Sequence, residues 1–459
     1  MLVATEITEI FKKQRRFFQT GKTKNIDFRR EQLKSLKSFI IEDREELLAA
    51  LKKDFNKSNL EGLETELVFC VREINHSLKH LKSWTKSKQV TADLFQLPAS
   101  AKIIAEPLGI ILIIGAWNYP IQLAIAPLIA AIAAGNCAIV KPSEIAPHSS
   151  VAIANLIRKV FSPEYITVVE GGKEIVQDLL THQFDHIFFT GGARVAKIVM
   201  EAAAKYLTPV TLELGGKSPC IIEPDIDVEK VAKRVAWGKF INCGQTCIAP
   251  DYVLIHHSIK AAFIDKIKAK IKQFYGNNPE ISPDYARIIN DFHFQRLLSL
   301  IDPKKVIIGG ENNPETRYIA PTVMNGVTWR DRIMEEEIFG PILPMLEYEN
   351  LEDAIAEINA RPKPLSLYLF THNKTTQERV LTATSSGNVC INDTLMQITS
   401  ANLPFGGVGN SGMGAYHGKI GFDTFSHQKS VLNRSFLLDL PLRYPPYEGK
   451  LKFFNFFLR

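Results

Sequence analysis

Five short apolar segments in the first half of the chain restrict its fold more than any other feature of the sequence. They lie at residues 109–115, 137–140, 166–169, 184–190 and 209–214. Segments this short and this rich in Val and Ile are typical of parallel strands that are buried on both faces. The stretches between them have helical character, and parallel strands need such crossovers. The alternation therefore predicts an α/β fold with a doubly wound parallel sheet, which binds ligands beyond the carboxyl ends of its strands.

The first 85 residues predict amphipathic helices that lie over a larger core. Apolar residues recur there at three- and four-residue spacing, as at Leu33 and Leu36, and charged residues fill the gaps. Two strand-like stretches follow, at residues 89–95 and 100–105. They predict a small hairpin that interrupts the helical region.

Length and composition are those of a soluble globular protein. A chain of 459 residues is too long for one ordinary core and predicts about two or three domains. Hydrophobic residues make up 46% of the chain and charged residues 23%, which is ordinary for a globular protein. The net charge of +6 is small and basic residues form no long run, so nucleic-acid binding is not expected.

The cysteines are scattered and form no C-x-x-C pair, so no metal site is expected. They are Cys70, Cys137, Cys220, Cys243, Cys247 and Cys390. Reduced thiols in a cytoplasmic protein are the simplest interpretation. The N-terminal segment is charged and polar and lacks the apolar core of a signal peptide.

Two motifs carry groups that are suited to covalent catalysis. Residues 240–247 read F-x-N-x-G-Q-x-C and end in Cys247, and residues 212–217 read L-E-L-G-G-K and contain Glu213. A thiol can attack an electrophilic carbon, and a nearby carboxylate can activate water to release the product. Either residue alone is weak evidence, because cysteine is also among the most commonly buried apolar residues.

Together with four further motifs, these two resemble the aldehyde dehydrogenase superfamily. The four lie at residues 117–120, 141–144, 337–341 and 404–407. Six motifs in family order over roughly 300 residues are not expected by chance. The resemblance implies a Rossmann-like cofactor domain, an α/β catalytic domain and a small bridging β-element. The implied boundaries are residues 1–85 and 106–212 for NAD(P) binding, 213–421 for catalysis, 86–105 and 422–436 for bridging and oligomerisation, and 437–459 for a C-terminal tail.

The resemblance also implies the roles of three catalytic residues. Cys247 would add to the aldehyde as the nucleophile, and Asn118 with the Cys247 backbone N–H would hold the oxyanion. Hydride loss would leave a thioester, and Glu213 would deprotonate the water that cleaves it. Cys243 lies about one turn earlier if the segment is helical, and it could be inert, a resolving thiol or a second nucleophile. We favour an inert thiol, because the family nucleophile aligns with Cys247.

NAD is the cofactor that the resemblance implies, with NADP as an alternative. Lys141 and Glu144 follow the second predicted strand, where nucleotide-binding folds place groups that bind ribose, and a carboxylate there disfavours an added phosphate. Gly191 and Gly192 lie at a strand-to-helix turn suited to a pyrophosphate, although a tight turn could by itself require small residues. The family often has a further glycine where this chain has Ala196, which weakens the phosphate-binding motif.

Further residues are expected near the nicotinamide. Glu337 and Phe339 resemble the pair that positions the nicotinamide ribose and ring. An acidic run such as residues 335–337 would by itself suggest a solvated helix end. The motifs also assign Trp117 and Leu214 to the cofactor site.

Two segments, residues 244–252 and 405–418, closely resemble the class 3 aldehyde dehydrogenases. Members of this class are usually dimers that act on medium- and long-chain aliphatic or aromatic aldehydes. Tyr119, Trp237 and Phe405 match positions that line the substrate tunnel, although buried aromatic residues are more often core residues. The physiological aldehyde stays open among fatty, aromatic and carotenoid-derived compounds.

The last ten residues, 450–459, combine four phenylalanines and two leucines with three basic residues. This tail is too short to span a bilayer, but it suits an anionic membrane surface. Class 3 fatty aldehyde dehydrogenases are anchored by C-terminal extensions, so the resemblance implies a cytoplasmic enzyme with a peripheral membrane contact. The alternative is that the tail docks on the protein, near the substrate entrance.

Two other functions remain as alternatives. A CoA-acylating dehydrogenase would release the acyl group by thiolysis, but those relatives generally lack the carboxylate that Glu213 supplies. A non-catalytic structural or stress-binding protein could reuse the fold, and the presence of Asn118, Glu213 and Cys247 argues against it.

Overall fold

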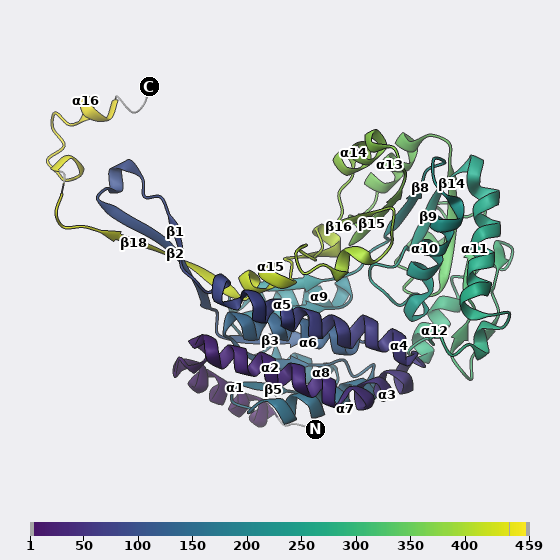
Figure 1. The fold of residues 1–459 in the computed structure, drawn as a ribbon, viewed down its shortest axis with the longest axis horizontal. Coiled ribbons are helices and arrows are strands. Elements are labelled where there is room, and N and C mark those ends of the chain that lie inside the picture. The colour runs from purple at the N-terminus through teal and green to yellow at the C-terminus, as the bar shows by residue number, and fades with distance from the viewer. Residues whose placement is uncertain (1–3, 440, 456–459) are drawn as a thin grey trace.

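The computed structural model describes residues 4–439 and 441–455, and its first large sheet has the strand order β17-β7-β6-β3-β4-β5 (Figure 1). The strands are β3 (Ile110–Ile114), β4 (Cys137–Lys141), β5 (Ile166–Val168), β6 (His186–Thr190), β7 (Val210–Glu213) and β17 (Gly412–Met413). The first five run parallel, and β17 adds an antiparallel edge to β7. Every residue of β3, β4 and β6 is buried. The predicted parallel sheet of an α/β fold is therefore confirmed.

Helices connect these strands and cover the sheet. They are α6 (Pro120–Ala134), α7 (Pro147–Val160), α8 (Lys173–Leu179) and α9 (Ala193–Ala204). Every residue of α6 is buried, which explains why this segment is apolar on all sides. Pro120 starts the helix with a pre-set φ, and Gly135 ends it in the left-handed conformation.

The N-terminal segment forms helices, as predicted. They are α1 (Ala4–Gln19), α2 (Ile26–Glu42), α3 (Arg44–Phe55), α4 (Asn59–Gly62), the π-helix η2 (Leu63–Val68) and α5 (Phe69–Trp84). Leu33 and Leu36 are fully buried, and α2 packs on α5, α6 and α7. Figure 1 shows this purple-to-blue layer of helices beside the first sheet.

A second large sheet follows in the chain, with the order β10-β13-β14-β9-β8-β15-β16. Its strands are β8 (Pro219–Ile222), β9 (Tyr252–His256), β10 (Val306–Ile308), β13 (Thr322–Met324), β14 (Ile342–Tyr348), β15 (Ser366–Phe370) and β16 (Asn388–Ile391). All neighbours are parallel except β10 and β13. The helices of this part are α10 (Val228–Phe240), α11 (Lys260–Tyr275), α12 (Asp291–Leu298), α13 (Leu351–Asn359) and α14 (Lys374–Ala383). A separate pair joins β11 (Asn312–Asn313) to β12 (Tyr318–Ile319).

A three-stranded antiparallel sheet forms an arm that projects from the body (Figure 1). It contains β1 (Lys88–Val90), β2 (Ala99–Pro107) and β18 (Ser426–Arg434), and β18 follows α15 (Gly418–Thr424). The predicted hairpin is confirmed, but its first strand ends at Val90 and the expectation for residues 91–95 was wrong. Asp93 and Gln96 exchange hydrogen bonds of 3.0 and 2.8 Å there, and these close a turn in place of strand pairing. The proposed domain boundaries stay a prediction.

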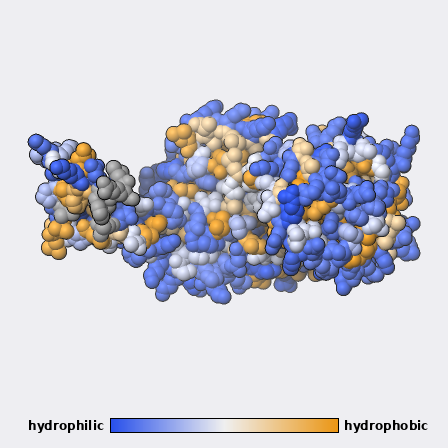
Figure 2. All heavy atoms as spheres, turned by 90° about the horizontal axis from the view of Figure 1, so that it is seen from above, coloured by the Kyte–Doolittle hydropathy of each residue, from blue (hydrophilic) through white to orange (hydrophobic). Residues whose placement is uncertain are grey.

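The C-terminal segment continues beyond the arm to a short helix, α16 (Leu451–Phe454). Figure 1 shows α16 beside the arm and away from both large sheets. Large apolar and aromatic side chains are exposed on this segment, and they include Phe436, Leu437, Tyr447 and Leu451. Figure 2 shows orange residues in the region of the arm. Residues 456–459, which the tail prediction also used, lie outside the described residues. Within residues 4–439 and 441–455, no helix combines the length and apolar character needed to cross a membrane.

Gly135→Ala is expected to destabilise the fold more than Gly21→Ala. Both glycines have left-handed φ angles, 92° and 75°, so alanine is strained at either position by about 1 kcal/mol. A Cβ at Gly135 would also meet the Arg29 guanidinium at 2.5 Å, whereas nothing lies within 4 Å at Gly21. Arg29 is buried and donates to the carbonyls of Thr23 (2.7 Å) and Ala133 (3.1 Å), so it cannot move freely.

We expect Gly135→Ala to lose about 1–3 kcal/mol more unfolding free energy than Gly21→Ala, in urea titrations followed by circular dichroism. Equal losses in the two variants would contradict the packing role of Gly135.

Candidate active site

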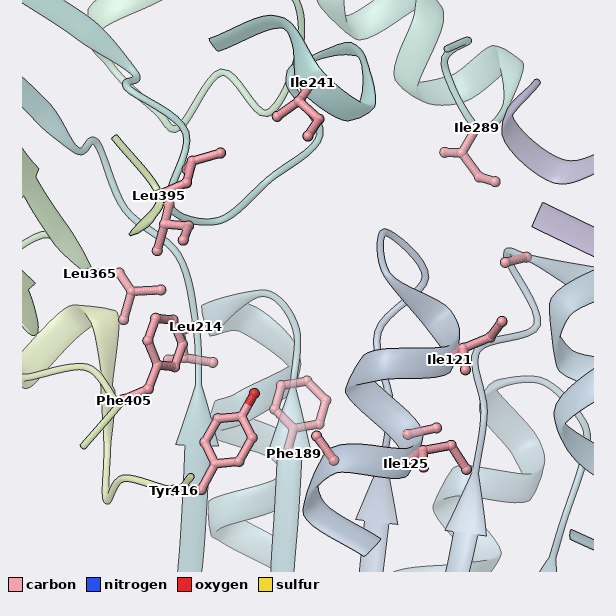
Figure 3. Close-up of a cluster of buried hydrophobic side chains, with 14 of the residues drawn as sticks. Ile121, Ile125, Phe189, Leu214, Ile241, Ile289, Leu365, Leu395, Phe405 and Tyr416 are labelled. Carbon is pink, nitrogen blue, oxygen red and sulfur yellow. The ribbon is translucent and has the colours of Figure 1, made fainter. Parts of the chain in front are cut away.

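A cavity of about 270 Å³ receives side chains from strands β6 and β7 of the first large sheet and from helices and loops of both parts of the chain. Its apolar lining consists of Val68, Phe69, Tyr119, Leu123, Trp237, Ile241, Ile248, Leu365, Leu395, Met396, Ile398, Phe405 and Tyr416. Figure 3 shows Leu365, Leu395, Phe405 and Tyr416, which reach this region from separate segments. The three residues predicted to contact substrate, Tyr119, Trp237 and Phe405, therefore share one cavity.

The polar lining is small, and it contains two of the three predicted catalytic residues. It consists of Glu64, Thr65, Arg72, Gln122, Thr190, Glu213, Thr246, Cys247 and Thr399. Cys247 comes from the loop after α10, and Glu213 ends strand β7 of the other large sheet. The cavity thus brings a thiol and a carboxyl group from distant parts of the chain to one apolar space.

The chain reaches Cys247 through an unusual turn, η4 (Ile241–Gly244). Asn242 and Cys243 have φ angles of 52° and 54°, in the left-handed region that non-glycine residues rarely adopt. Such residues cost about 1–3 kcal/mol each and persist only where surrounding contacts hold them. Gly244 is also left-handed, and a Cβ there would overlap the backbone of a neighbouring loop. The segment from Cys243 to Cys247 is therefore not one turn of a regular helix.

Side-chain hydrogen bonds hold this turn in place. The Asn242 Nδ2 donates to the carbonyl oxygens of Asn118 (2.8 Å) and Gln245 (3.1 Å). The Gln245 Nε2 donates to the carbonyls of Asn242 and Arg287, both at 3.0 Å, and its Oε1 accepts the Ile289 N–H at 3.0 Å. Because these bonds reach two other segments of the chain, they fix the turn against its surroundings.

The Cys247 thiol lies in an environment that opposes its ionisation. Burial raises the pKa of this thiol well above its usual range, and the nearby Glu337 and Glu213 raise it further. The backbone N–H groups of Cys247 and Ile248 lower the pKa only in part. Attack by this thiol therefore requires that its proton be transferred to another group.

Glu213 is a buried carboxyl group whose two oxygens have no hydrogen-bond partner among the described residues. Burial raises the pKa of Glu213 well above its usual range. An unpartnered carboxyl group on a cavity wall is suited to bind a water molecule or accept a proton.

Two hydroxyl groups that line the cavity were not predicted as site residues from the sequence. The Thr190 and Tyr416 hydroxyls line the cavity, are buried, and have no partner in the part of the chain that the structure describes. Thr190 is the register partner of Glu213 in the pairing of β6 with β7. The common end of these two predicted strands could have identified Thr190, whereas no sequence signal identifies Tyr416.

Asn118 is not among the residues that line the cavity. Its side chain is buried, and its Nδ2 donates to the Gln245 carbonyl at 3.1 Å, two residues before the thiol. The next residue, Tyr119, is joined to Thr246 by a 2.8 Å hydrogen bond between their hydroxyls. Two hydrogen bonds therefore join the segment that contains Asn118 to the loop that carries Cys247.

Cys243 is separated from this chemistry. It is fully buried and absent from the cavity lining, and its Sγ donates to the Tyr285 hydroxyl at 3.5 Å. Burial raises the pKa of this thiol to about 12. These contacts favour the interpretation of Cys243 as an inert thiol.

Four of the predicted cofactor residues lie at the carboxyl ends of β4 and β6. Lys141 is buried and forms an ion pair with the half-exposed Glu144. Gly192 is the N-cap of the 12-residue helix α9 and makes no side-chain cap, and a Cβ there would meet open space. A Cβ at Gly191 would approach the Phe189 ring at 2.6 Å. An uncapped helix N-terminus beside small residues fits a phosphate group. Ala196, where the family often has a further glycine, is a buried residue of α9.

The other predicted cofactor residues come from the loops that follow β3 and β7 and from the segment that precedes β14. Trp117 contacts the Phe339 ring edge-on at 5.3 Å, and Leu214 is buried at the end of β7. The carboxyl group of Glu337 packs on Gly215, where a Cβ would overlap it.

Residues 335–337 follow the short 3-10 helix η7 (Arg332–Met334), whose C-cap is Glu335, and they do not continue it. The Nζ of Lys217 binds the carbonyls of Ile333 and Glu336 at 2.9 Å and the carboxylate of Asp251 at 2.6 Å. Asp251 in turn accepts the Ile338 N–H at 3.0 Å. These bonds take up the backbone groups that a helix would use, and they direct Glu337 inward.

Comparison with known proteins connects this arrangement to one family. The protein-family model described as "Aldehyde dehydrogenase family" matches residues 2–431 of this chain. Aldehyde dehydrogenase family 3 member A2 of Macaca fascicularis is 48% identical over 447 residues, which cover 97% of this chain and 92% of that protein. The 4,4'-diaponeurosporen-aldehyde dehydrogenase of Staphylococcus aureus is 47% identical over 455 residues, which cover 99% of both proteins.

A solved structure is similar over the full chain. The substrate-bound state of Staphylococcus aureus AldH has 46% sequence identity, covers 100% of both chains and gives a TM-score of 0.97. The arrangement of the two large sheets and the arm is therefore shared with a protein whose structure is known.

Glu337→Gln is expected to weaken the dependence of stability on pH. Burial, followed by the charge of Asp251, raises the pKa of Glu337 to about 8. The folded protein therefore keeps a proton that the unfolded chain releases above about pH 4.5, so this group makes stability fall as pH rises from about 5 to 8. The variant has no such proton, and its decline in urea midpoint between pH 5.5 and 8 should be smaller.

The exposed neighbour Glu335→Gln is the matched control and should keep the decline of the unmodified protein. An identical decline in the Glu337→Gln variant would show that this carboxyl group is ionised in the folded state at neutral pH.

Proposed function

The chain belongs to the aldehyde dehydrogenase family, and we propose that Cys247, Glu213 and Asn118 carry out its NAD(P)-dependent oxidation of aldehydes to carboxylic acids. One observation carries the assignment. Cys247 and Glu213 line the same apolar cavity, and the Glu213 carboxyl group has no partner among the described residues. A stable fold does not need an unpartnered buried carboxyl group, which costs free energy, whereas the proposed chemistry does need it.

In the first half-reaction, the Cys247 sulfur forms a bond to the aldehyde carbon, and the thiol proton leaves to a base. Glu213 is the base that shares the cavity. The aldehyde oxygen becomes an oxyanion, which the Cys247 backbone N–H and the second N–H of the Asn118 amide stabilise, because the first N–H of that amide donates to the Gln245 carbonyl. The chemistry that bound NAD(P) supplies is acceptance of a hydride from this carbon. The product on Cys247 is a thioester.

In the second half-reaction, water attacks the thioester carbon. Glu213 takes a proton from that water, the carbon–sulfur bond breaks, and the acid leaves while Cys247 regains its proton. Thr190 and Tyr416 place hydroxyl groups on the same wall, so they can help to hold the water. The unpartnered carboxyl group favours hydrolysis over transfer of the acyl group to CoA.

We assign the cofactor contacts to two groups of residues. Lys141 and Glu144 hold the adenosine ribose, and the turn at Gly191 and Gly192 faces the pyrophosphate. The second group, at the nicotinamide, consists of Trp117, Leu214, Glu337 and Phe339. NAD is favoured over NADP, because an added phosphate would approach the Glu144 carboxylate.

The proposed substrates are medium- and long-chain aliphatic, aromatic or carotenoid-derived aldehydes. The cavity lining is largely apolar, with Tyr119, Trp237 and Phe405 among its aromatic members. The relatives support this range, since one is named for diaponeurosporen aldehyde. Apolar chains bind such a lining by losing contact with water.

We also propose a homodimer in which the exposed apolar residues of the arm and the C-terminal segment are covered. These include Phe436 and Leu437, which are almost fully exposed in the single chain. Tyr447, Leu451 and Phe453 continue this apolar surface toward the tail. We further propose a cytoplasmic enzyme whose tail binds anionic membranes, which would make its membrane association peripheral.

The two half-reactions can be separated by Glu213→Gln. The first NADH should still form, although more slowly, because water can accept the thiol proton in place of Glu213 and the oxyanion donors are unchanged. Steady-state turnover should fall by roughly 10²–10⁴-fold, the usual contribution of a positioned base. Stopped-flow absorbance should therefore show a burst of NADH followed by near arrest, whereas Cys247→Ala should show no burst.

The buried Cys243→Ala is the matched control and should keep turnover. Steady-state turnover of Glu213→Gln at the original rate would remove this residue from the mechanism. Activity that disappears in Cys243→Ala but persists in Cys247→Ala would reverse the assignment of the nucleophile.

Substrate length should raise kcat/KM until the cavity is filled. Each buried methylene contributes about 0.8 kcal/mol, so two further carbons should improve kcat/KM roughly tenfold. Steady-state rates with unbranched aldehydes of increasing length test this expectation. Truncation after Tyr447 should weaken binding to anionic vesicles and should spare turnover of short aldehydes. Equal kcat/KM for acetaldehyde and long aldehydes would contradict an apolar substrate site.

A further inference from the structure

A cluster of charged residues, two of them fully buried, lies in η2 and in the segment that joins α3 to this π-helix. Lys57 and Glu66 form an ion pair with a 2.9 Å separation of Nζ and Oε1, and both side chains are fully buried. Glu61 lies between them in the chain. A π-helix is uncommon and often accompanies a functional site, and Thr65 and Val68 of η2 line the cavity.

The ion pair is bonded to the start of α6, directly after Asn118. The second oxygen of Glu66 accepts the backbone N–H groups of Ile121 (2.8 Å) and Gln122 (3.3 Å). The helix has no side-chain cap of its own, so Glu66 replaces it. The Nζ of Lys57 lies 4.5 Å from the centre of the Tyr119 ring. These contacts fix the segment that carries Asn118.

Glu61 is bonded to the turn that leads to the thiol. Its Oε1 accepts the Asn242 backbone N–H at 3.0 Å. Asn242 is the first of the two left-handed residues, and its side chain donates to the Asn118 carbonyl. The Glu61 contact therefore holds a residue whose left-handed backbone conformation is unfavourable. At the same residue, the two segments that provide the proposed oxyanion donors meet.

We propose that Glu61 is a positioning residue for aldehyde oxidation, which holds the left-handed turn at Asn242 so that the Asn118 amide and the Cys247 N–H stay aligned on one oxyanion. The Lys57–Glu66 pair is the second anchor, because it holds the Asn118 segment from the other side. The inference rests on the proposed roles of Cys247 and Asn118. A buried ion pair is weak evidence for stability, since apolar residues can replace one without loss. The hydrogen bonds of the Lys57–Glu66 pair to the start of α6 favour a role in positioning the Asn118 segment.

Glu61→Ala and Glu61→Gln separate positioning from folding. Alanine removes the acceptor, whereas glutamine keeps an oxygen at the same distance and loses only the charge. We expect Glu61→Ala to slow formation of the first NADH by about 10- to 100-fold, part of the 10²–10³-fold that loss of a complete oxyanion donor costs. Glu61→Gln should recover most of that rate. Leu60→Ala, at an exposed neighbouring position of α4, is the control and should react at the original rate.

A second measurement distinguishes misalignment from local unfolding. Alkylation of Cys247 by iodoacetamide forms no oxyanion, so its rate, followed by mass spectrometry of the Cys247 peptide, should stay unchanged in Glu61→Ala. NAD binding should also stay unchanged. If Glu61→Ala does not fold, Glu61→Asp keeps the charge and withdraws the acceptor by one methylene, and it should show the same slow first turnover.

An original rate of the first turnover in Glu61→Ala would overturn the inference, as would a Glu61→Gln variant that is equally slow. Failure of the proposed function has a different signature. The unmodified enzyme would then form no NADH from aldehydes, or Asn118→Ala would keep the original rate of the first turnover.

Discussion

The left-handed turn at Asn242 and Cys243 is the constraint on which the arrangement of the site depends. It ends α10 and redirects the chain, so that Cys247 reaches the cavity from the second sheet while Glu213 reaches it from the first. Neither residue of the turn is a glycine, so the conformation persists because Gln245, Asn118 and Glu61 bind its polar groups.

The topology of the first sheet supplies the other wall. Parallel strands end at one edge, and β6 and β7 therefore deliver Thr190 and Glu213 as neighbours in register. The chain then crosses to the second sheet through Gly215, whose lack of a side chain lets the Glu337 carboxyl group approach. The site thus combines a strand edge, a strained turn and a crossing segment, and each element limits where the next can lie.

The parts of this arrangement that depend on local pattern were predictable from the sequence. The apolar strands and the motif residues Glu213 and Cys247 were placed correctly on loops and strand ends, because burial and turn chemistry leave clear patterns. The conformation of Asn242 was not predictable, since its support comes from Glu61, 181 residues away. The hairpin boundary failed for a different reason, because a local exchange of hydrogen bonds between Asp93 and Gln96 ended the strand early.

Charge places a further limit on the order of events at the site. Cys247, Glu213 and Glu337 are three acidic groups in one buried region, and burial raises the pKa of each. The charge of Lys217 lowers the pKa of Glu337 only in part, and Lys217 is itself paired with Asp251 at 2.6 Å. A thiolate beside a charged Glu213 is therefore disfavoured, since each negative charge raises the pKa of the other group. With the proposed roles, Glu213 takes the thiol proton when Cys247 reacts. That proton must leave Glu213 before the same carboxylate can take one from water. Loss of this proton from Glu213, as well as entry of water, must therefore occur between the two half-reactions.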